Sequence, residues 1–446
     1  MNLAATFLYA KRIVFPKKSN VSRGTKSLFG AMICIGISLI PLVAILTVSE
    51  GMIDGITHRM IELSSHDLQI SAEDSDWQKS SYQEIKNFSH KIEEIPGIQK
   101  SYPEISCSAL VAGKNYRSGA YIRAVEKNLF QIDKGFNEYF ELIDGERSFE
   151  NQNDAIIGKH LSEVLNLKAG DSFRIITINR VGQSVVPKLS SFVVKGIVSC
   201  GYQELDALWI FIPIESAFKN LALNSCQFSI GLSTDFTFDN QKLFKLQNDV
   251  QNFLYSEESL ENSYVIRWDE ANRSQFENFS STKALLLLIV LVILLAASIN
   301  ISSGVVMLVM ERKKEIAILK STGATSFGIS FAFLIAGTSC GLGGLLFGLP
   351  IGLFVSVNVN EIIKFFENIA NFFVNIFNIL VYSKDVVNAN VHILNPEYYL
   401  QNIPINIPVQ KLILMSVFTL VLSMIMAALP SIKAGKEKPI NTLRKV

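Results

Sequence analysis

The sequence predicts an α-helical membrane protein with four transmembrane helices and one large extracytoplasmic α+β domain. Of the 446 residues, 49% are hydrophobic and only 18% are charged, which is too apolar for a soluble protein and too polar for a wholly embedded one. Long uncharged runs occur near the start and in the second half of the chain. Between them, about 200 residues alternate strand-like and helical patterns, enough for one or two domains with their own cores. The formal net charge of +1 gives no indication of a nucleic-acid partner, and we expect none.

The N-terminal segment 1–26 contains six basic residues and no acidic one, and we expect it to be cytoplasmic. The apolar run after it, assigned to a first span at 27–49, is longer than the core of a signal peptide and has no small-residue cleavage site behind it. It is therefore predicted to be an uncleaved anchor. Helix-compatible spacing continues through 47–68, so we expect this helix to project beyond the membrane as an amphipathic stalk.

The extracytoplasmic domain is assigned to 50–280, with helical stalks at both ends. Alternating or β-branched runs predict strands, and apolar residues at helical spacing predict helices. The segment 177–191 lies between two of these strands and contains Gly182 and Pro187, so it is either a plain hairpin loop or a projecting arm used for docking. The predicted strands are 67–72, 104–112, 119–125, 172–179, 191–199, 207–212, 226–232 and 263–268, and the predicted helices are 79–95, 159–167, 214–222 and 240–254.

The second and third spans form a hairpin, at 281–310 and 326–358, around a short charged elbow at 311–325. Gly323 is a plausible stop for a helix in this elbow. In the third span, glycines recur at a spacing of four, at 337 and 341 and again at 344, 348 and 352. This spacing favours close helix packing over the alternative that the glycines only bend the helix.

The segment 359–410 follows, and its Phe-rich part at 362–381 is hydrophobic enough to suggest a fifth span. An odd number of spans would place the basic tail, 432–446, on the side opposite the basic N-terminus. Lys364, Glu367 and four asparagines would also make a poor membrane core. We therefore predict an interfacial or packed helix outside the membrane, a fourth span at 411–431 and both termini in the cytoplasm.

No catalytic or metal-binding motif is recognisable. The Gly-Lys pairs lack the other residues of a phosphate-binding loop, and the histidines form no HxxxH or HExxH pair. His58 and His66 are expected on the solvated side of the stalk. Cys107, Cys200 and Cys226 could form one disulfide, although three buried thiols are favoured. We expect no enzyme and no metal, and a transporter of this kind would need a partner to supply its energy.

The elbow sequence Met310–Thr325, MERKKEIAILKSTGAT, resembles the elbow of FtsX-like ABC permeases, where it is a coupling helix seated in a groove of the ATPase subunit. The chain end at 429–444 is similar to the way those permeases end. Three further stretches resemble the LolC/LolE lipoprotein-releasing branch of this superfamily. They are 157–171, which begins Ile157-Gly158-Lys159, the segment 397–405 with Tyr398 and Tyr399, and Val185-Val186-Pro187-Lys188.

This resemblance implies a role for particular residues. Residues of the elbow would face the ATPase, residues at the outer ends of the first two spans would line a cavity for the lipoprotein, and the arm would be the hook on which a periplasmic carrier docks. The ATPase-coupling residues are Glu311, Glu315, Ile316, Leu319 and Gly323; the cavity residues are Glu50, Gly51, Met52, Ile53, Ile56, Phe276 and Phe279; the hook residues are Val185, Val186, Pro187 and Lys188.

The resemblance also implies the fold and the partners. The extracytoplasmic domain would be a MacB-like periplasmic core, and the protein would lie in the bacterial inner membrane. The partners would be a LolD-like ABC ATPase, a second permease that is a paralogue or an identical copy, lipoprotein substrates, a LolA-like periplasmic carrier and membrane lipid. The chain itself would bind no cofactor, because ATP and magnesium would bind to the ATPase. ATP binding would press the permeases together and expel the lipid-anchored cargo.

Two other functions fit the same layout. A MacB-type efflux permease for a drug, peptide or other small substrate shares the four spans and the elbow, and would be accompanied by an adaptor protein. An FtsX-like mechanotransducing subunit transports nothing and activates a cell-wall hydrolase, but its outer domain is usually smaller. A plain receptor on a membrane anchor leaves the elbow unexplained.

Overall fold

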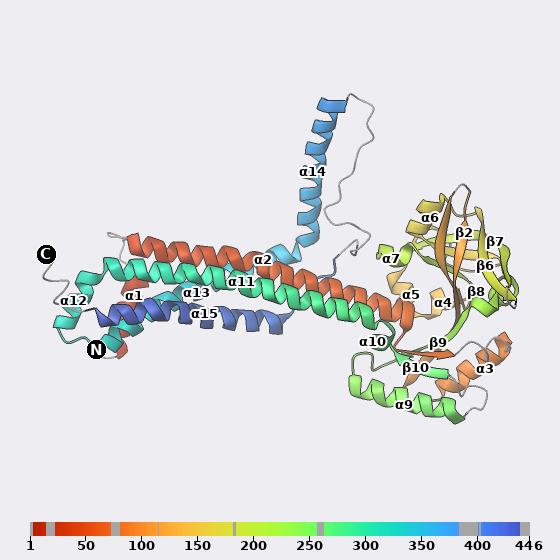
Figure 1. Cartoon of the computed structure of the whole chain (residues 1–446), viewed down its shortest axis with the longest axis horizontal. Helices are drawn as coiled ribbons and strands as arrows, with labels where there is room; N and C mark the ends of the chain where they lie inside the picture. The colour runs from red at the N-terminus through yellow and green to blue at the C-terminus, as the bar shows by residue number, and fades with distance from the viewer. Residues whose placement is uncertain are drawn as a thin grey trace. The chain divides into compact units, whose positions relative to one another are not determined.

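The computed structural model describes residues 3–14, 23–72, 81–114, 116–181, 184–256, 263–382, 400 and 403–437. The chain divides into two compact units (Figure 1). The first unit comprises Met1–Gly51, Phe279–Val391 and Pro404–Val446, and the second comprises Met52–Asn278 and His392–Ile403. Parts of the expected cytoplasmic tail, 438–446, and the Tyr398–Tyr399 pair lie outside the described residues.

The first unit is a bundle of helices. Among the described residues, four helices are long and apolar enough to cross a membrane: Lys26–Ser65, Arg273–Glu311, Ser326–Val357 and Val409–Lys436. The fold class of four spans plus a large α+β domain is therefore confirmed. The helices of this unit are α1 (Leu3–Val14), α2 (Arg23–Met60), α11 (Arg273–Glu311), α12 (Lys313–Ser321), α13 (Ser326–Val357), α14 (Val359–Tyr382) and α15 (Val409–Lys436).

Glycines on α13 allow the spans to approach closely. A Cβ built on Gly337 would lie 2.4 Å from the Cβ of Ala427, and one on Gly341 would lie 2.3 Å from the Oγ of Ser423, both on α15. The next three glycines contact α2 in the same way. The packing interpretation of the glycine pattern is therefore confirmed, because small residues at helix contacts let backbones come within van der Waals range. The glycines that contact α2 are Gly344, Gly348 and Gly352.

The N-terminal helix α1 was not predicted, because its sequence was treated only as a basic segment. It packs on α13, where the ring of Tyr9 lies edge-on to Phe333 with centroids 6.3 Å apart. Ile13 is buried, whereas Phe7 and Leu8 are exposed. One face of α1 therefore belongs to the core of the bundle.

The second unit is built on a ten-stranded mixed sheet. Strand β2 is shared by two parts of this sheet. Its first half pairs with β9, which continues to β1 and β10, and its second half pairs with β3 and β6. Pairing then runs from β3 through β8, β5 and β7 back to β6, so six strands close a ring. The strands are β1 (Leu68–Ala72), β2 (Ile98–Ala112), β3 (Arg117–Val125), β4 (Glu141–Gly145), β5 (Asp154–Gly158), β6 (Ser172–Val181), β7 (Ser184–Ser199), β8 (Trp209–Pro213), β9 (Gln227–Thr234) and β10 (Ser263–Arg267).

Helices cover the sheet and complete its core. Helix α3 begins with a capping box between Ser81 and Glu84, which satisfies free amides of its first turn. It buries Ile85 and Ile92. Helix α9 buries one apolar face in the same way. The helices of this unit are α3 (Tyr82–Glu93), α4 (Leu129–Ile132), α5 (Lys134–Tyr139), α6 (Lys159–Leu165), α7 (Gln203–Asp206), α8 (Ile214–Asn220), α9 (Asn240–Ser256) and α10 (Trp268–Ala271), together with the π-helical turn η1 (Ile61–Ser65) and the 3-10 turn η3 (Leu223–Ser225).

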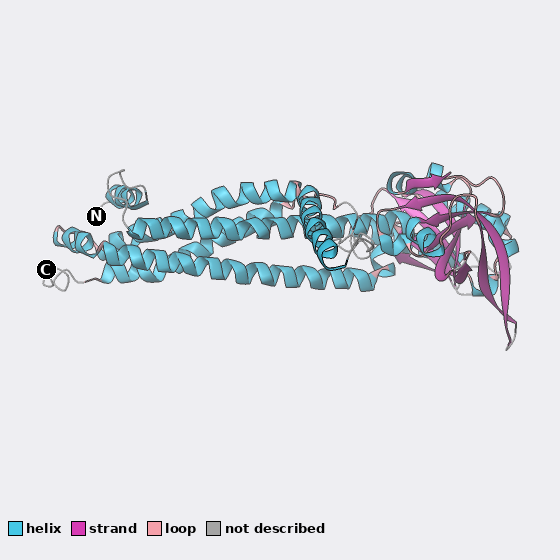
Figure 2. Ribbon diagram, turned by 90° about the horizontal axis from the view of Figure 1, so that it is seen from above, coloured by secondary structure: helices cyan, strands magenta, loops and turns pink. Residues whose placement is uncertain are grey.

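The segment predicted to lie between two strands, 177–191, is itself strand over 177–181 and 184–191, and Gly182 lies outside the described residues. Strands β6 and β7 pair without interruption from Ser172 opposite Val193 to Val181 opposite Ser184. The pairing of β2 with β6 ends at Ile176, so the last part of this hairpin extends past its neighbour as an arm, seen at the lower right of Figure 2. Pro187, which has no backbone N–H, is tolerated here because it lies in the projecting part of the hairpin, where a strand can lack one hydrogen-bond donor.

Candidate functional site

The elbow contains the helix α12, which ends in a Schellman motif. Gly323 has a φ of +94°, its amide donates to the carbonyl of Lys320 at 3.1 Å, and the amide of Ala324 donates to Leu319 at 2.9 Å. Glycine adopts this left-handed conformation without steric cost, whereas it strains residues that have a Cβ. The helix stop predicted at Gly323 is therefore present, and Thr325 caps the next helix by accepting from the amide of Gly328 at 3.2 Å.

Only part of the expected ATPase-facing set points away from the bundle. Glu315 is exposed and pairs with Arg312, and Leu319 is half-buried. Ile316 is fully buried in the bundle core, so the expectation that its side chain faces a partner is wrong. Exposed apolar residues at this end include Ile318, which is 56% exposed, and Phe327, which is 78% exposed. Neither was selected from the sequence, although the i, i+3 spacing of Glu315 and Ile318 places them on one face.

Glu311 is held by the first turn of α2. Its carboxylate accepts a hydrogen bond from the amide of Gly24 at 2.5 Å. A carboxylate at the N-terminus of a helix is stabilised by the free amides and the helix dipole. This contact ties the end of α11 to the start of α2.

The elbow is anchored to the end of the last span. The ammonium group of Lys320 donates to the carbonyls of Gly435 at 2.5 Å and Glu437 at 2.8 Å. Lys313 lies 3.1 Å from the carboxylate of Glu437. A cation at a helix C-terminus binds its unpaired carbonyls and complements the dipole. Both lysines therefore attach α12 to the end of α15.

A cluster of three charged residues joins the spans at the opposite end of the bundle, which we call the α14 end. Glu50 on α2 pairs with Lys283 on α11 at 3.1 Å and with Lys411 on α15. The carboxylate side chain is only 21% exposed. Glu50, one of the expected cavity residues, therefore links the three helices α2, α11 and α15.

The remaining cavity residues do not form one open pocket. Gly51 lies against the main chain of Pro404, because a Cβ built on it would be 1.9 Å from that carbonyl oxygen. Ile56 is buried. For these two residues the expected cavity lining is wrong, since close packing leaves their positions no open surface. Glu50, Gly51 and Phe279 belong to the first unit, and the half-buried Met52, Ile53 and Phe276 belong with Ile56 to the second.

Within the second unit, a buried arginine fixes the turn η1 that follows α2. Arg123, on β3, forms two hydrogen bonds to Glu104, at 2.7 and 2.6 Å, and also donates to the carbonyl of Leu63 in η1. Its guanidinium lies over the ring of Trp209, 4.6 Å from the centroid. A buried bidentate pair of this kind is costly to break, because one charge would remain without its partner.

The residue after η1 has an unusual conformation. His66 has a φ of 50° and is buried, so its expected position on the solvated side of the stalk is wrong. Its ring stacks on Tyr102 with centroids 4.7 Å apart, and a Cβ on Gly231 would lie 1.9 Å from this ring. Burial lowers the pKa of His66. The imidazole therefore packs in its neutral form.

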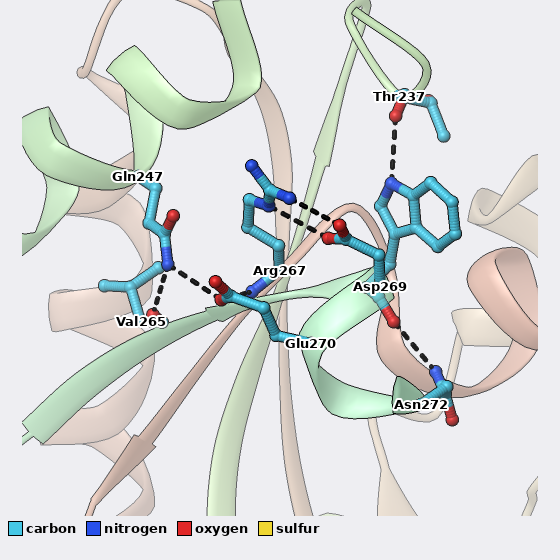
Figure 3. Close-up of polar contacts among 8 residues, drawn as sticks. Thr237, Gln247, Val265, Arg267, Asp269, Glu270 and Asn272 are labelled. Carbon is cyan, nitrogen blue, oxygen red and sulfur yellow. Dashed lines mark hydrogen bonds and ion pairs between the residues drawn. The ribbon is translucent and has the colours of Figure 1, made fainter. Parts of the chain in front are cut away.

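Helix α10 is held in the second unit by a network of side chains (Figure 3). Arg267 forms a bidentate ion pair with Asp269, one hydrogen bond of which measures 2.9 Å. The indole of Trp268 donates to the carbonyl of Thr237 at 2.9 Å, and Gln247 donates to the carbonyl of Val265 at 2.9 Å.

The two stalk connections are neighbours in the sheet. Strand β1 follows η1, strand β10 precedes α10, and the two strands pair antiparallel with Leu68 opposite Arg267. The amide of Trp268 also donates to the carbonyl of Asp67 at 3.2 Å. Because hydrogen-bonded neighbouring strands cannot separate without losing their ladder, the outer-domain ends of α2 and α11 are held together.

The hairpin arm presents two of the expected hook residues. Val186 and Pro187 are exposed, whereas the side chain of Val185 lies outside the described residues. Lys188 donates to the carbonyls of Lys219 and Leu221, both at 2.9 Å, at the end of α8. Lys188 therefore anchors the arm to the domain. Exposed Ile178 and Leu189 extend the apolar surface of the arm.

The described residues contain no group of three or more His, Cys, Asp or Glu side chains that could hold a metal ion. All five cysteines are free thiols, and Cys107, Cys200 and Cys226 are buried. Of the two alternatives left by the sequence, the structure contains the three buried thiols.

Two family models match this chain. The model described as MacB-like periplasmic core domain matches residues 28–239, and the one described as FtsX-like permease C-terminal matches residues 287–384. The chain is 26% identical to the lipoprotein-releasing system transmembrane protein LolC of Neisseria meningitidis serogroup B, over 92% of each chain. The chain belongs to the FtsX-like ABC permeases of the LolC/LolE family.

Another relative and one solved structure are similar to parts of this FtsX-like permease. It is 21% identical to the lipoprotein-releasing system transmembrane protein LolE of Haemophilus influenzae, over 80% of each chain. The crystal structure of the periplasmic region of MacB from Actinobacillus actinomycetemcomitans covers 48% of the permease and 94% of that chain, with 12% identity and a TM-score of 0.30. The four apolar helices and the match to the MacB-like periplasmic core domain make the permease a multi-pass membrane protein with such a domain.

Proposed function

We propose that this permease is the transmembrane subunit of an ATP-driven transporter that extracts lipoproteins from the bacterial inner membrane and passes them to a periplasmic carrier. The observation that carries this proposal is the similarity to LolC, which extends over 92% of both chains and includes the spans, the elbow and the outer domain. In this arrangement both termini and α12 are cytoplasmic. A second permease, identical or paralogous, completes the complex.

The elbow supports a role in coupling to a separate ATPase subunit. Its exposed surface combines Glu315 with the apolar Ile318, and Phe327 is exposed at the start of the next helix, α13, a mixture suited to an interface. Behind this surface, Lys320 connects α12 to the end of α15. Movement of an ATPase against α12 would therefore move a span. ATP and magnesium bind to that ATPase.

The outer ends of α2 and α11 support a role in handling the cargo. Met52, Ile53 and Phe276, all in the second unit, are half-buried apolar residues near these ends, and methionine and aromatic side chains adapt to flexible acyl chains. Acyl chains gain about 0.8 kcal/mol per buried CH₂ in the membrane, so several chains leave it only with an external source of energy. ATP supplies that energy.

The hairpin arm supports a role in docking a LolA-like carrier. Its Val186, Pro187 and Leu189 are exposed beyond the ring of strands, and the anchored Lys188 keeps the arm in place. An exposed apolar strand pair offers both side chains and an edge to a partner.

Co-purification of the full chain from native membranes, with proteins and lipids identified by mass spectrometry, tests this function. We expect an ABC ATPase together with triacylated lipoproteins. An ATPase with an adaptor protein and no acylated protein would indicate a MacB-type efflux permease. An ATPase with a cell-wall hydrolase in place of cargo would indicate an FtsX-like mechanotransducer.

A further inference from the structure

Helix α14 is not required by the function proposed above. Its apolar side chains recur at spacings of three and four, so they share one face of the helix. The four phenylalanines of this face are between 55% and 63% exposed. The residues of this apolar face are Phe365, Phe366, Ile369, Phe372, Phe373 and Ile376.

The opposite face of α14 is polar with little charge. It carries Lys364, Glu367 and three asparagines, at 368, 371 and 375. Helices that bind membranes by charge are rich in lysine and arginine on this face, whereas α14 has one lysine against Glu361 and Glu367. Its attraction to a surface therefore depends on apolar contact.

The place of α14 in the bundle identifies that surface. The span α13 ends at Val357, and α14 begins at Val359, so its first turn lies where a span leaves the membrane. In Figures 1 and 2, α14 runs across the long axis of the bundle. Because spans stand near the membrane normal, a helix across their axis at this end lies along the membrane surface.

We propose that α14 is an interfacial helix whose phenylalanine face inserts among the acyl chains of the leaflet at the α14 end of the bundle. Its asparagine face remains in the headgroup region and water. The helix binds the lipid surface independently of anionic headgroups, and it holds the outer end of α13 at a fixed depth. This inference does not depend on the substrate of the transporter.

Nitroxide labels on opposite faces of α14 test the proposal in the full chain, reconstituted in phosphatidylcholine vesicles. Phe366→Cys and Phe373→Cys report on the apolar face, and Asn368→Cys and Asn375→Cys are their matched controls, two residues away on the other face. The background carries Cys34→Ser, because Cys34 is the exposed native thiol and the other four are buried. Leu288→Cys, at an exposed position of the span α11, reports correct insertion of the chain.

The measured quantity is the ratio of collision rates with oxygen, which concentrates in the acyl region, and with a water-soluble nickel chelate. We expect this ratio to be about tenfold higher at positions 366 and 373 than at 368 and 375, and unchanged when phosphatidylglycerol is added. Equal, high nickel collision at all four positions would overturn the proposal, because the helix would lie in water. Low collision with both reagents at 366 and 373 would also overturn it, since a protein surface would cover them. Insertion only with phosphatidylglycerol would refute binding without anionic lipid.

Discussion

The ammonium group of Lys320 on α12 lies 2.8 Å from the main-chain carbonyl of Glu437, just past the end of α15. It also donates to the carbonyl of Gly435. Lys320 therefore caps the C-terminus of α15 and also attaches the elbow to the bundle. Lys313 adds an ion pair with the carboxylate of Glu437 at 3.1 Å, so two lysines of the elbow join it to the end of the last span.

Replacing this lysine by methionine is expected to uncouple the two helices. Lys320→Met removes hydrogen bonds from a charged donor, each of which contributes about 1.5–3 kcal/mol, and keeps the aliphatic stem. We expect ATP-driven transport to fall about tenfold or more, while the ATPase still binds. Lys433→Met, on the exposed surface of α15, is the matched control. Equal transport by both variants and the native protein would show that this anchor does not transmit force.

The packing of α13 on α15 predicts a stability effect at Gly341. Gly341→Ala places a Cβ 2.3 Å from the Oγ of Ser423, and overpacking of this kind costs about 1–3 kcal/mol. Gly30→Ala adds the same methyl group to α2 where no atom lies within 4 Å. Thermal unfolding of the purified protein in detergent should show a lower midpoint for Gly341→Ala alone. Equal midpoints would mean that α13 and α15 move apart to accommodate the added methyl group at no cost in stability.

Removal of the buried arginine should destabilise the outer domain. Arg123→Met leaves the carboxylate of Glu104 without its cation, which costs about 3–5 kcal/mol when a buried pair loses one partner. Arg117→Met, at the exposed start of the same strand, should change stability by less than about 0.5 kcal/mol. Urea unfolding followed by tryptophan fluorescence reports on this unit, because all three tryptophans lie between residues 52 and 278. A small effect of Arg123→Met would show that the turn η1 is held by other contacts.

The buried His66 predicts a loss of stability in mild acid. Burial lowers its pKa in the folded state, whereas in the unfolded chain it titrates near about 6.5. Between these two values the unfolded state binds a proton that the folded state does not, so stability falls as the pH drops below about 6.5, by up to about 1.4 kcal/mol per pH unit. The same fluorescence measurement at several pH values should show this slope. His66→Gln should reduce the slope, and a slope equal to that of the native protein would exclude His66 as the cause.

The sequence predicted the spans and most strands because their patterns are strong and local. Each of the eight predicted strands is present with shifted ends. The short strand β4 has no buried residue, and β5 is buried throughout, so neither shows the alternation of buried and exposed residues that marks a half-buried strand. Both depend on pairing with the distant β7.

The site residues were predictable as a region but not one by one. The elbow was located by its charge, yet the expected Ile316 is buried and Ile318, two residues away, is exposed, because the bundle core covers only one face of α12. His66 was misplaced because its burial depends on Gly231, which is far along the sequence. Arg123 was missed because an isolated arginine on a strand gives no sign of burial beside Glu104.

Release of a triacylated lipoprotein from proteoliposomes tests the central claim most directly. The vesicles would contain this permease, its co-purified subunits and a lipoprotein, with a soluble LolA-like carrier outside. We predict that ATP transfers the lipoprotein to the carrier, that Lys320→Met abolishes most of this transfer, and that omission of the carrier prevents it. ATP hydrolysis without any transfer, in a complex that contains all subunits, would contradict the assignment as a lipoprotein-releasing permease.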